Sequence, residues 1–161
     1  MKKLGKLSLK DLRKEMPVVE NQEQVHIYGG TWSPYSIGSA DDSYNCHSYA
    51  WGDCSSWIND PTNLISAGSY TEKTEDYQEG DKVIYYIDEN GNDAYDSGEP
   101  IYHSAIVDSV SNGGLTLSSL RSKWGESNIM VHQNYGTPYD VVDTDMDGYM
   151  DTITSVAVLG N

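Results

Sequence analysis

Basic residues and long apolar segments are scarce in this sequence, and both shortages exclude classes of function. Lys and Arg number 10 among 161 residues, against 25 Asp and Glu, and the formal net charge is -15. A chain this acidic repels phosphate backbones and anionic lipid surfaces, so we expect no nucleic acid and no membrane among its partners. No segment approaches the roughly 18 consecutive apolar residues of a membrane-spanning helix, and no apolar run near the start forms the core of a secretory signal.

Internal repeats and low-complexity tracts are also absent from the sequence. Its length fits one domain with a core of its own. Hydrophobic residues make up 37% of the chain and aromatic residues 11%, so the chain is not depleted in apolar residues as disordered chains are. We therefore expect it to fold.

Cysteine is scarce too, because the chain has only Cys46 and Cys54. On one continuous helix their Cα atoms would lie about 12 Å apart, beyond the reach of a disulfide. Either the helix ends early near Gly52 or the two thiols are separate. The cysteines and histidines lack the paired short spacings of structural zinc modules, so a zinc site is not expected.

The first thirty residues differ from the rest in charge. Residues 1–30 hold six of the 10 basic and four of the 25 acidic residues, which leaves four basic and 21 acidic residues beyond them. Leucines recur at helical spacing before Pro17, and Gly29-Gly30 follows as an extended, exposed backbone that a narrow protease cleft accepts. The alternative is an ordinary amphipathic first helix packed on the domain.

This segment resembles the double-glycine leader peptides of bacteriocins and related small secreted bacterial proteins. The resemblance implies that the peptidase domain of a dedicated ABC exporter is a partner and cuts after Gly30. The mature protein then begins at Thr31 and is secreted. Residues 1–30 are thus the expected leader peptide, and residues 31–161 the expected mature domain.

Within residues 31–161, one expected helix precedes a series of expected strands. Residues 44–58 have the length and apolar recurrence of a short helix, with Asp42 or Ser43 as a candidate N-cap. Strand-like stretches rich in β-branched residues or Tyr follow at 82–87, 101–110, 115–122, 128–132 and 152–159. A helix before a run of strands without intervening helices predicts an α+β domain with an antiparallel sheet.

Cys46 and His103 have the positions that nucleophilic catalysis needs. A thiol in the first turn of a helix feels the positive end of the helix dipole, which favours the thiolate. His103 lies in an expected strand whose same-face neighbours are apolar (Ile101, Ala105 and Val107), and that face is expected to pack on the helix. There His103 can hold Cys46 as an ion pair and later protonate a leaving amine. The alternative is a small core cysteine and a hydrogen-bonded buried histidine.

Three motifs in order resemble the NlpC/P60 and CHAP group of papain-like cysteine peptidases and amidases. They are Asn45-Cys46-His47-Ser48 at a helix start, the stretch EGDKVIYY at 79–86, and HSAIV at 103–107. The resemblance covers roughly residues 43–125 and implies a papain-like (NlpC/P60-type) fold, with a helix packed on an antiparallel sheet. It also implies Cys46 as nucleophile, His103 as general base, and peptidoglycan peptides or related amide bonds as substrates. The backbone amide of Cys46 is the expected oxyanion donor.

The same family places a third polar residue after the histidine strand, where it orients the imidazole. Ser122 is the nearest candidate, and His132 and Asp108 are its rivals. Three aromatic residues are expected either to line the cleft or to pack in the core: Tyr44, Trp51 and Trp124.

Residues 88–99 (DENGNDAYDSGE) have the oxygen-donor spacing of an EF-hand loop. Positions 1, 3, 5, 7, 9 and 12 of such a loop bind Ca²⁺ through oxygen, and here they are Asp88, Asn90, Asn92, the carbonyl of Ala94, Asp96 and Glu99. Position 6, usually Gly, is Asp93, so the turn is expected to be made somewhat differently. The loop resembles the EF-hand-like calcium loops of extracellular bacterial proteins. The alternative is a solvated acidic hairpin loop.

Residues 143–154 repeat this spacing with one departure, because position 12 is Thr154 instead of Glu. The expected ligands are Asp143, Asp145, Asp147, the carbonyl of Tyr149 and Asp151. Without the bidentate carboxylate we expect weaker affinity, but extracellular sites function at about 10⁻⁴–10⁻³ M. The sequence therefore predicts Ca²⁺ as a cofactor that stabilises the fold.

Together these features predict an exported bacterial cysteine amidase or endopeptidase that acts on cell-wall peptides and is stabilised by calcium. The alternative is a non-enzymatic secreted module on the same fold, either a bacteriocin-like toxin or a calcium-dependent binding domain. A disulfide between Cys46 and Cys54 would favour that alternative.

Overall fold

The structure is a computed structural model that describes residues 33–52, 54–133, 137–142 and 152–161. These residues belong to one unit of the chain, 32–161. The expected leader (1–30) and the five expected ligands of the second calcium loop (143–151) lie outside the described residues.

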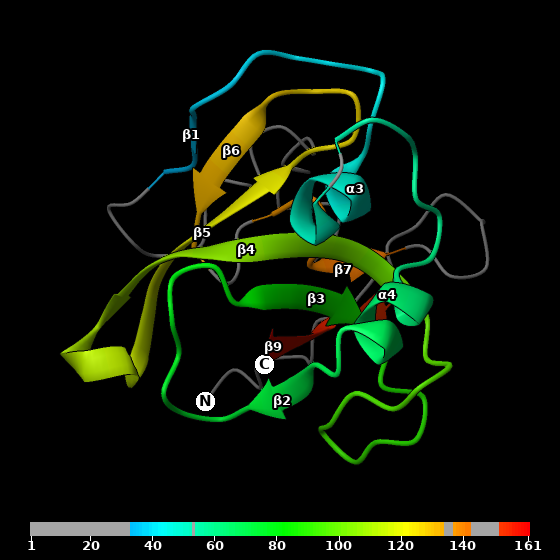
Figure 1. The fold of residues 1–161 in the computed structure, drawn as a ribbon, viewed down its shortest axis with the longest axis vertical. Helices are drawn as coiled ribbons and strands as arrows, with labels where there is room; N and C mark the ends of the chain where they lie inside the picture. The colour runs from blue at the N-terminus through cyan, green and yellow to red at the C-terminus, as the bar shows by residue number, and fades with distance from the viewer. Residues whose placement is uncertain (1–32, 53, 134–136, 143–151) are drawn as a thin grey trace, which may run out of the picture. The chain divides into compact units, whose positions relative to one another are not determined.

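An antiparallel sheet forms the centre of the described part (Figure 1). Seven strands follow one another across it in the order β1-β6-β5-β4-β3-β9-β2, and each neighbouring pair is antiparallel. The strands are β1 (Tyr35–Ser36), β2 (Thr71–Lys73), β3 (Lys82–Tyr86), β4 (Ile101–Ser111), β5 (Thr116–Lys123), β6 (Ile129–His132) and β9 (Ser155–Gly160). A separate pair consists of β7 (Val141–Val142) and β8 (Thr152–Ile153).

The helices of the described part are short. They are α3 (Cys46–Trp51), α4 (Thr62–Ala67) and a single 3-10 turn, η1 (Asn112–Gly114), at the tip of the β4–β5 hairpin. With a mostly antiparallel sheet, these helices give an α+β arrangement. No helix of the described residues has the length and apolar character needed to cross a membrane.

The helix expected over residues 44–58 is shorter than predicted. Its N-cap is Asn45, not Asp42 or Ser43, and it ends at Gly52, which takes the left-handed conformation with φ of 114°. The Gly52 amide donates to the carbonyl of Ser48, which closes the last turn as a C-terminal glycine does. Gly52 therefore ends the helix before Cys54, one of the two outcomes that the sequence left open.

The sheet buries apolar side chains on both faces. One cluster contains Val83, Tyr85, Ala105, Val107, Leu120 and Val158. The other contains Ile65, Ile84, Tyr86, Ala157 and Leu159, and the half-buried Trp51 and Tyr70 pack against it. Because Trp51 belongs to α3 and Ile65 to α4, both helices cover this second face, as Figure 1 shows.

The expected orientation of β4 against the helix is wrong. His103 contacts the ring of Tyr85 and shares the face of Ala105 and Val107, while the neighbouring Ser104 bonds to side chains of α3. Alternate residues of a strand point to opposite faces, so His103 belongs to the face opposite α3. Ile101 does not share that face, because the pairing with β3 shifts between Tyr85 and Tyr86.

Candidate functional site

Cys46 is the first residue of α3, and Asn45 holds it there. The Asn45 side chain accepts from the amides of Ser48 at 3.1 Å and Ile58 at 3.3 Å, and it donates to the Ile58 carbonyl at 2.7 Å. These bonds join the helix start to the chain that follows the helix. Cys46 itself is 6% exposed, so the thiol lies just beneath the surface in a fixed place.

Burial controls the protonation of the Cys46 thiol. It raises the pKa of Cys46, and the effect is opposed by hydrogen bonding to the backbone of Ser104, His47 and Cys46 and by the charge of Lys123. The resting thiol is therefore protonated, whereas the helix-start argument favoured the thiolate. Desolvation outweighs the end of a helix that has only six residues.

His103 is fully buried in β4, and within the described residues neither ring nitrogen has a hydrogen-bond partner. The ring stacks on Tyr139, with 3.9 Å between centroids and 9° between planes. Burial lowers the pKa of His103 well below its ordinary value, and His132 and His47 lower it further. The imidazole is thus neutral and oriented by stacking. Two unpaired buried nitrogens are rare enough to require an explanation, and a catalytic role is one of the recognised ones.

Tyr139 connects the thiol and the imidazole. Its ring stacks on His103, while burial and the neighbouring Cys46 raise the pKa of its hydroxyl to about 12. Thr154 fixes this tyrosine by donating to its carbonyl at 2.8 Å. Cys46 lies beside the backbone of Ser104, the residue next to His103. Tyr139 and the backbone of Ser104 thus link the surroundings of Cys46 with those of His103, and within the described residues no hydrogen bond joins the thiol to the imidazole.

Ser122, expected to orient His103, bonds to His132 instead. The Ser122 hydroxyl lies 2.8 Å from Nε2 of His132 and accepts from Nε1 of Trp124 at 3.0 Å. The other imidazole nitrogen of His132 is 2.6 Å from the carbonyl of Gln133. Ser122 and its rival His132 are therefore hydrogen-bond partners of each other.

The remaining rival, Asp108, interacts elsewhere. Its carboxylate pairs with Arg121 at 3.5 Å and accepts from Ser119 at 3.1 Å. Among the described residues, Tyr139 is the side chain that orients His103 by direct ring contact from outside the sheet. It is one of 13 tyrosines, and no local pattern distinguishes it in the sequence.

Ser104 fastens α3 to the sheet. Its hydroxyl lies 2.8 Å from Nδ1 of His47 and accepts from Nε1 of Trp51 at 3.2 Å. Burial lowers the pKa of His47 to about 4, so this bond is made by the neutral imidazole. Trp51 in turn meets Tyr70 edge-on at 5.1 Å. This contact occupies Trp51 in packing, one of the two expected uses of the aromatic residues.

No disulfide joins Cys46, which is buried, to Cys54, which is exposed. A disulfide would have supported the non-enzymatic alternative, and it is not formed.

The family model described as "Domain of unknown function (DUF7689)" matches residues 35–142. The chain belongs to this family. No curated protein and no solved structure matches the chain. The DUF7689 region includes Cys46, His103 and Tyr139 and the whole of the first predicted calcium loop, and it ends one residue before the second loop begins.

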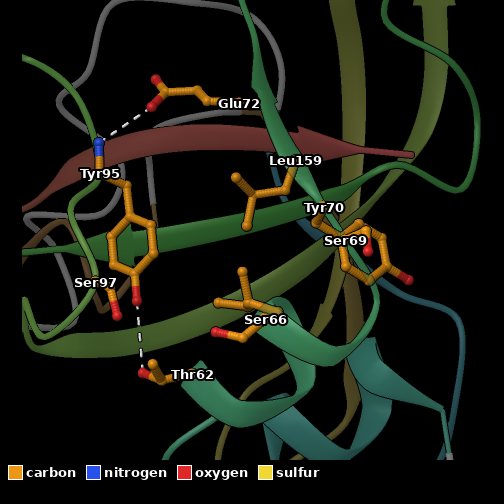
Figure 2. Close-up of a pocket in the computed structure, with 9 residues that line it drawn as sticks. Thr62, Ser66, Ser69, Tyr70, Glu72, Tyr95, Ser97 and Leu159 are labelled. Carbon is orange, nitrogen blue, oxygen red and sulfur yellow. Dashed lines mark hydrogen bonds between the residues drawn. The ribbon is translucent and has the colours of Figure 1, made fainter.

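A separate pocket of about 230 Å³ is lined by residues of the DUF7689 region and of β9, and Cys46 is not among them (Figure 2). Its wall is rich in hydroxyl groups, from residues Thr62, Ile65, Ser66, Ser69, Tyr70, Glu72, Tyr95, Ser97 and Leu159. The Tyr95 amide donates to Glu72 at 3.0 Å, and its hydroxyl lies 3.5 Å from that of Thr62. Tyr95 thereby fastens the loop of residues 88–99 to β2 and α4.

That loop of the DUF7689 region is organised around Asp88. The Asp88 carboxylate accepts from the amides of Gly91 at 2.7 Å, Asn92 at 3.2 Å and Asp93 at 2.8 Å. Asp93 adopts a φ of 59°, so this residue itself makes the left-handed turn for which Gly is usual. The amide bonds, that of Asp93 first, lower the pKa of Asp88.

The other predicted ligands of the loop also converge. The side-chain amides of Asn90 and Asn92 donate to one oxygen of Asp96, at 2.8 and 2.7 Å. Glu99 is 7% exposed and accepts from the amides of Glu89 at 3.0 Å and Asp96 at 2.9 Å. Side chains at positions 1, 3, 5, 9 and 12 thus share one hydrogen-bonded loop.

This donor set is chemically suited to a hard cation. All its candidate ligands offer oxygen, as Ca²⁺ requires. In the present arrangement the two Asn side chains turn their nitrogens towards Asp96, and rotating the amides would present oxygen instead. Among the described residues, no group of three or more His, Cys, Asp and Glu is positioned to hold a metal ion. Binding would therefore require the carboxylates and amides of the loop to rearrange.

Proposed function

We propose that the chain is a secreted bacterial cysteine amidase or endopeptidase of papain-like (NlpC/P60-type) fold that cleaves peptide bonds of peptidoglycan. Cys46 is the nucleophile and His103 the general base. The main support is His103, fully buried with both ring nitrogens unpaired, next to the residue whose backbone contacts the Cys46 thiol. A polar side chain in that condition is explained if its partner appears during the reaction.

The reaction begins from a neutral thiol and a neutral imidazole. His103 takes the Cys46 proton as the sulfur attacks the carbonyl carbon, and the new oxyanion is held by the backbone amide of Cys46. His103 then gives the proton to the leaving nitrogen as the C–N bond breaks. Water, deprotonated by His103, hydrolyses the thioester and restores the thiol. Apo enzymes often lack a short bond between nucleophile and base, and the bond tightens with substrate.

Purified peptidoglycan tests the proposal directly. The full chain and its Cys54→Ala variant are expected to release peptide fragments with new amino termini, whereas Cys46→Ala is expected to release none. Cys54→Ala is the matched control, because it removes an exposed thiol. His103→Gln is expected to reduce release by roughly 10²–10⁴-fold. Equal release by the unmodified chain and Cys46→Ala would reject Cys46 as nucleophile.

Calcium is part of the proposed function as a stabilising ion. Asp88, Asp96 and Glu99, with Asn90, Asn92 and the Ala94 carbonyl, would hold it. A bound ion would offset the carboxylate charge gathered in the loop. Because Tyr95 ties the loop to β2 and α4, stabilising the loop is expected to stabilise the domain.

Export through a peptidase-containing ABC transporter completes the proposal. It is supported by Gly29-Gly30 and by the change of charge beyond residue 30. The mass of the secreted protein is expected to match a chain that begins at Thr31. A secreted protein that still begins at Met1 would contradict cleavage after Gly30.

A further inference from the structure

Lys123, at the end of β5, is fully buried, and within the described residues no ion pair joins it to a carboxylate. Its ammonium donates to the carbonyls of Gly125 at 2.7 Å and Ser127 at 2.8 Å and lies 5.1 Å from the centre of the Tyr44 ring. The ion pairs of the described residues join other side chains, Lys73 with Asp81 and Arg121 with Asp108. Lysine is almost never fully buried unless it is paired with an anion.

The surroundings of Lys123 lead to Cys46. Tyr44, beneath the ammonium, precedes the thiol by two residues. Gly125, which accepts from Lys123, also lies beside the hydroxyl of Tyr139, the residue that stacks on His103. Helix α3 packs against β5 as well as β4, and the charge of Lys123 acts on the thiol. The buried cation and the proposed nucleophile therefore share one site.

We propose that Lys123 is a positioning residue that stabilises the Cys46 thiolate when it forms, in addition to the imidazolium that His103 becomes on taking the proton. The inference rests on the proposed function only in taking Cys46 as the reactive group. Lys123 acts through its electrostatic field, because its ammonium already donates hydrogen bonds to the carbonyls of Gly125 and Ser127.

Charged groups near α3 and its flanks include Asp41, which interacts with Lys123 and Tyr44, and the Arg121–Asp108 pair, which interacts with Tyr49. The other titratable groups around the thiol are neutral near pH 7. On α3 and its flanks, burial lowers the pKa of His47 and raises those of Tyr44 and Tyr49. On β4 burial lowers the pKa of His103, and in the segment before β7 it raises that of Tyr139. Among these described groups, Lys123 carries the charge that bears on Cys46.

Alkylation of Cys46 tests the inference without substrate. In a Cys54→Ser background, iodoacetamide reports on Cys46 alone: the sulfur–carbon bond forms and iodide leaves. Lys123→Met is expected to move the pH midpoint of the alkylation rate up by about one unit and to slow the reaction at pH 7 about tenfold. Lys123→Arg, which keeps the charge, is expected to retain most of the rate. An unchanged midpoint in folded Lys123→Met would overturn the inference.

A second measurement decides the matter if Lys123→Met does not fold. In the full chain, the Cε carbon of Lys123 is followed by NMR as pH is raised. Its resonance is expected to shift at the midpoint of Cys46 ionisation, and the shift is expected to vanish in Cys46→Ala. A Lys123 signal that does not respond to Cys46 would overturn the inference.

The two proposals fail separately. A chain that releases no peptidoglycan fragments, yet shows a thiol midpoint dependent on Lys123, rejects the amidase function and keeps this inference. Fragment release together with a thiol midpoint that does not depend on Lys123 keeps the amidase function and rejects this inference.

Discussion

Burying the imidazole of His103 lowers the stability of the fold. A buried donor or acceptor without a partner costs about 1–3 kcal/mol, and among the described residues both nitrogens of this imidazole lack one. Its neighbours, Tyr85 and Tyr139, are aromatic rings that offer stacking but no bond in the plane of the imidazole. A side chain of similar size without polar atoms would fit this place better.

We therefore expect His103→Leu to raise the free energy of unfolding by about 1 kcal/mol at pH 7 while abolishing fragment release. His132→Leu is the matched control, because both nitrogens of His132 lie within bonding distance of partners, and we expect it to destabilise the fold. Urea denaturation measures both. If His103→Leu were as destabilising as His132→Leu, the two unpaired nitrogens would not be a source of strain.

At the scale of elements, α3 depends on Asn45. Six residues are too few to form a stable helix alone, so the cap and the bonds to Ile58 hold the start at which Cys46 lies. Asn45→Ala is expected to reduce the free energy of unfolding by about 2 kcal/mol, because it removes a cap and leaves the amide of Ile58 unpaired.

Asn63→Ala, an exposed change within α4, is the control for Asn45→Ala and is expected to be nearly neutral, since alanine favours helix. Urea unfolding of both variants provides the measurement. A loss at Asn45 no larger than the one at Asn63 would mean that the cap is not what holds the helix start.

Elements that are specified by their own local sequence were predictable, and features that depend on contacts between distant residues were not. The main strands, β3, β4, β5, β6 and β9, each overlap a predicted stretch, because runs of β-branched residues and tyrosines specify them locally. The edge strands β1 and β2 have two and three residues, too few to show a period. The face of β4 was assigned wrongly because both faces of the sheet bury apolar residues, so the sequence of one strand does not show which face the helix covers.

The residues of the candidate site also fall into those with a local sequence motif and those that depend on distant contacts. Cys46 and His103 could be proposed as site residues from the sequence because each stands in a recognisable local motif, and their catalytic roles stay predictions. Tyr139 and Lys123 belong to the site through stacking and burial that involve residues far away in the chain. Nothing in their own neighbours marks them.

The loop of residues 88–99 is the element on which the calcium proposal can be tested. Millimolar Ca²⁺ is expected to raise the melting temperature and EDTA to lower it, because an ion relieves repulsion among the carboxylates. Glu99→Gln is expected to remove much of this response, whereas Glu79→Gln, which changes an exposed carboxylate outside the loop, is expected to preserve it. A melting temperature that changes with neither Ca²⁺ nor EDTA would contradict the proposal.

For the whole molecule, charge is concentrated more than the total of -15 suggests. Five acidic residues lie in 88–99 and four in 143–154, so nine of the 21 acidic residues beyond residue 30 are in two loops. Self-repulsion of so acidic a chain opposes folding at neutral pH. Protonating carboxylates relieves that repulsion, but mainly near pH 4.

Buried histidines act on stability in the opposite direction and at higher pH. The pKa values of His47, His103 and His132 are all lowered in the folded protein, chiefly by burial, that of His47 to about 4. The unfolded chain takes up protons at these residues near pH 6.5, and the folded protein does not. Their contribution is therefore present above pH 6.5 and is lost as pH falls below it, in the case of His47 down to about 4.

We accordingly expect the free energy of unfolding to fall between pH 7 and pH 5, before carboxylate protonation relieves repulsion. His47, whose pKa is lowered to about 4, would contribute about 2 kcal/mol to this fall, at about 1.4 kcal/mol for every pH unit below 6.5, and His103 and His132 would add to it. Urea midpoints at pH 7, 6 and 5 measure it, and His103→Leu is expected to make the decline shallower by removing one of the residues that cause it. A midpoint that stays constant or rises on acidification would mean that charge repulsion, and not the buried imidazoles, dominates the response of this fold to pH.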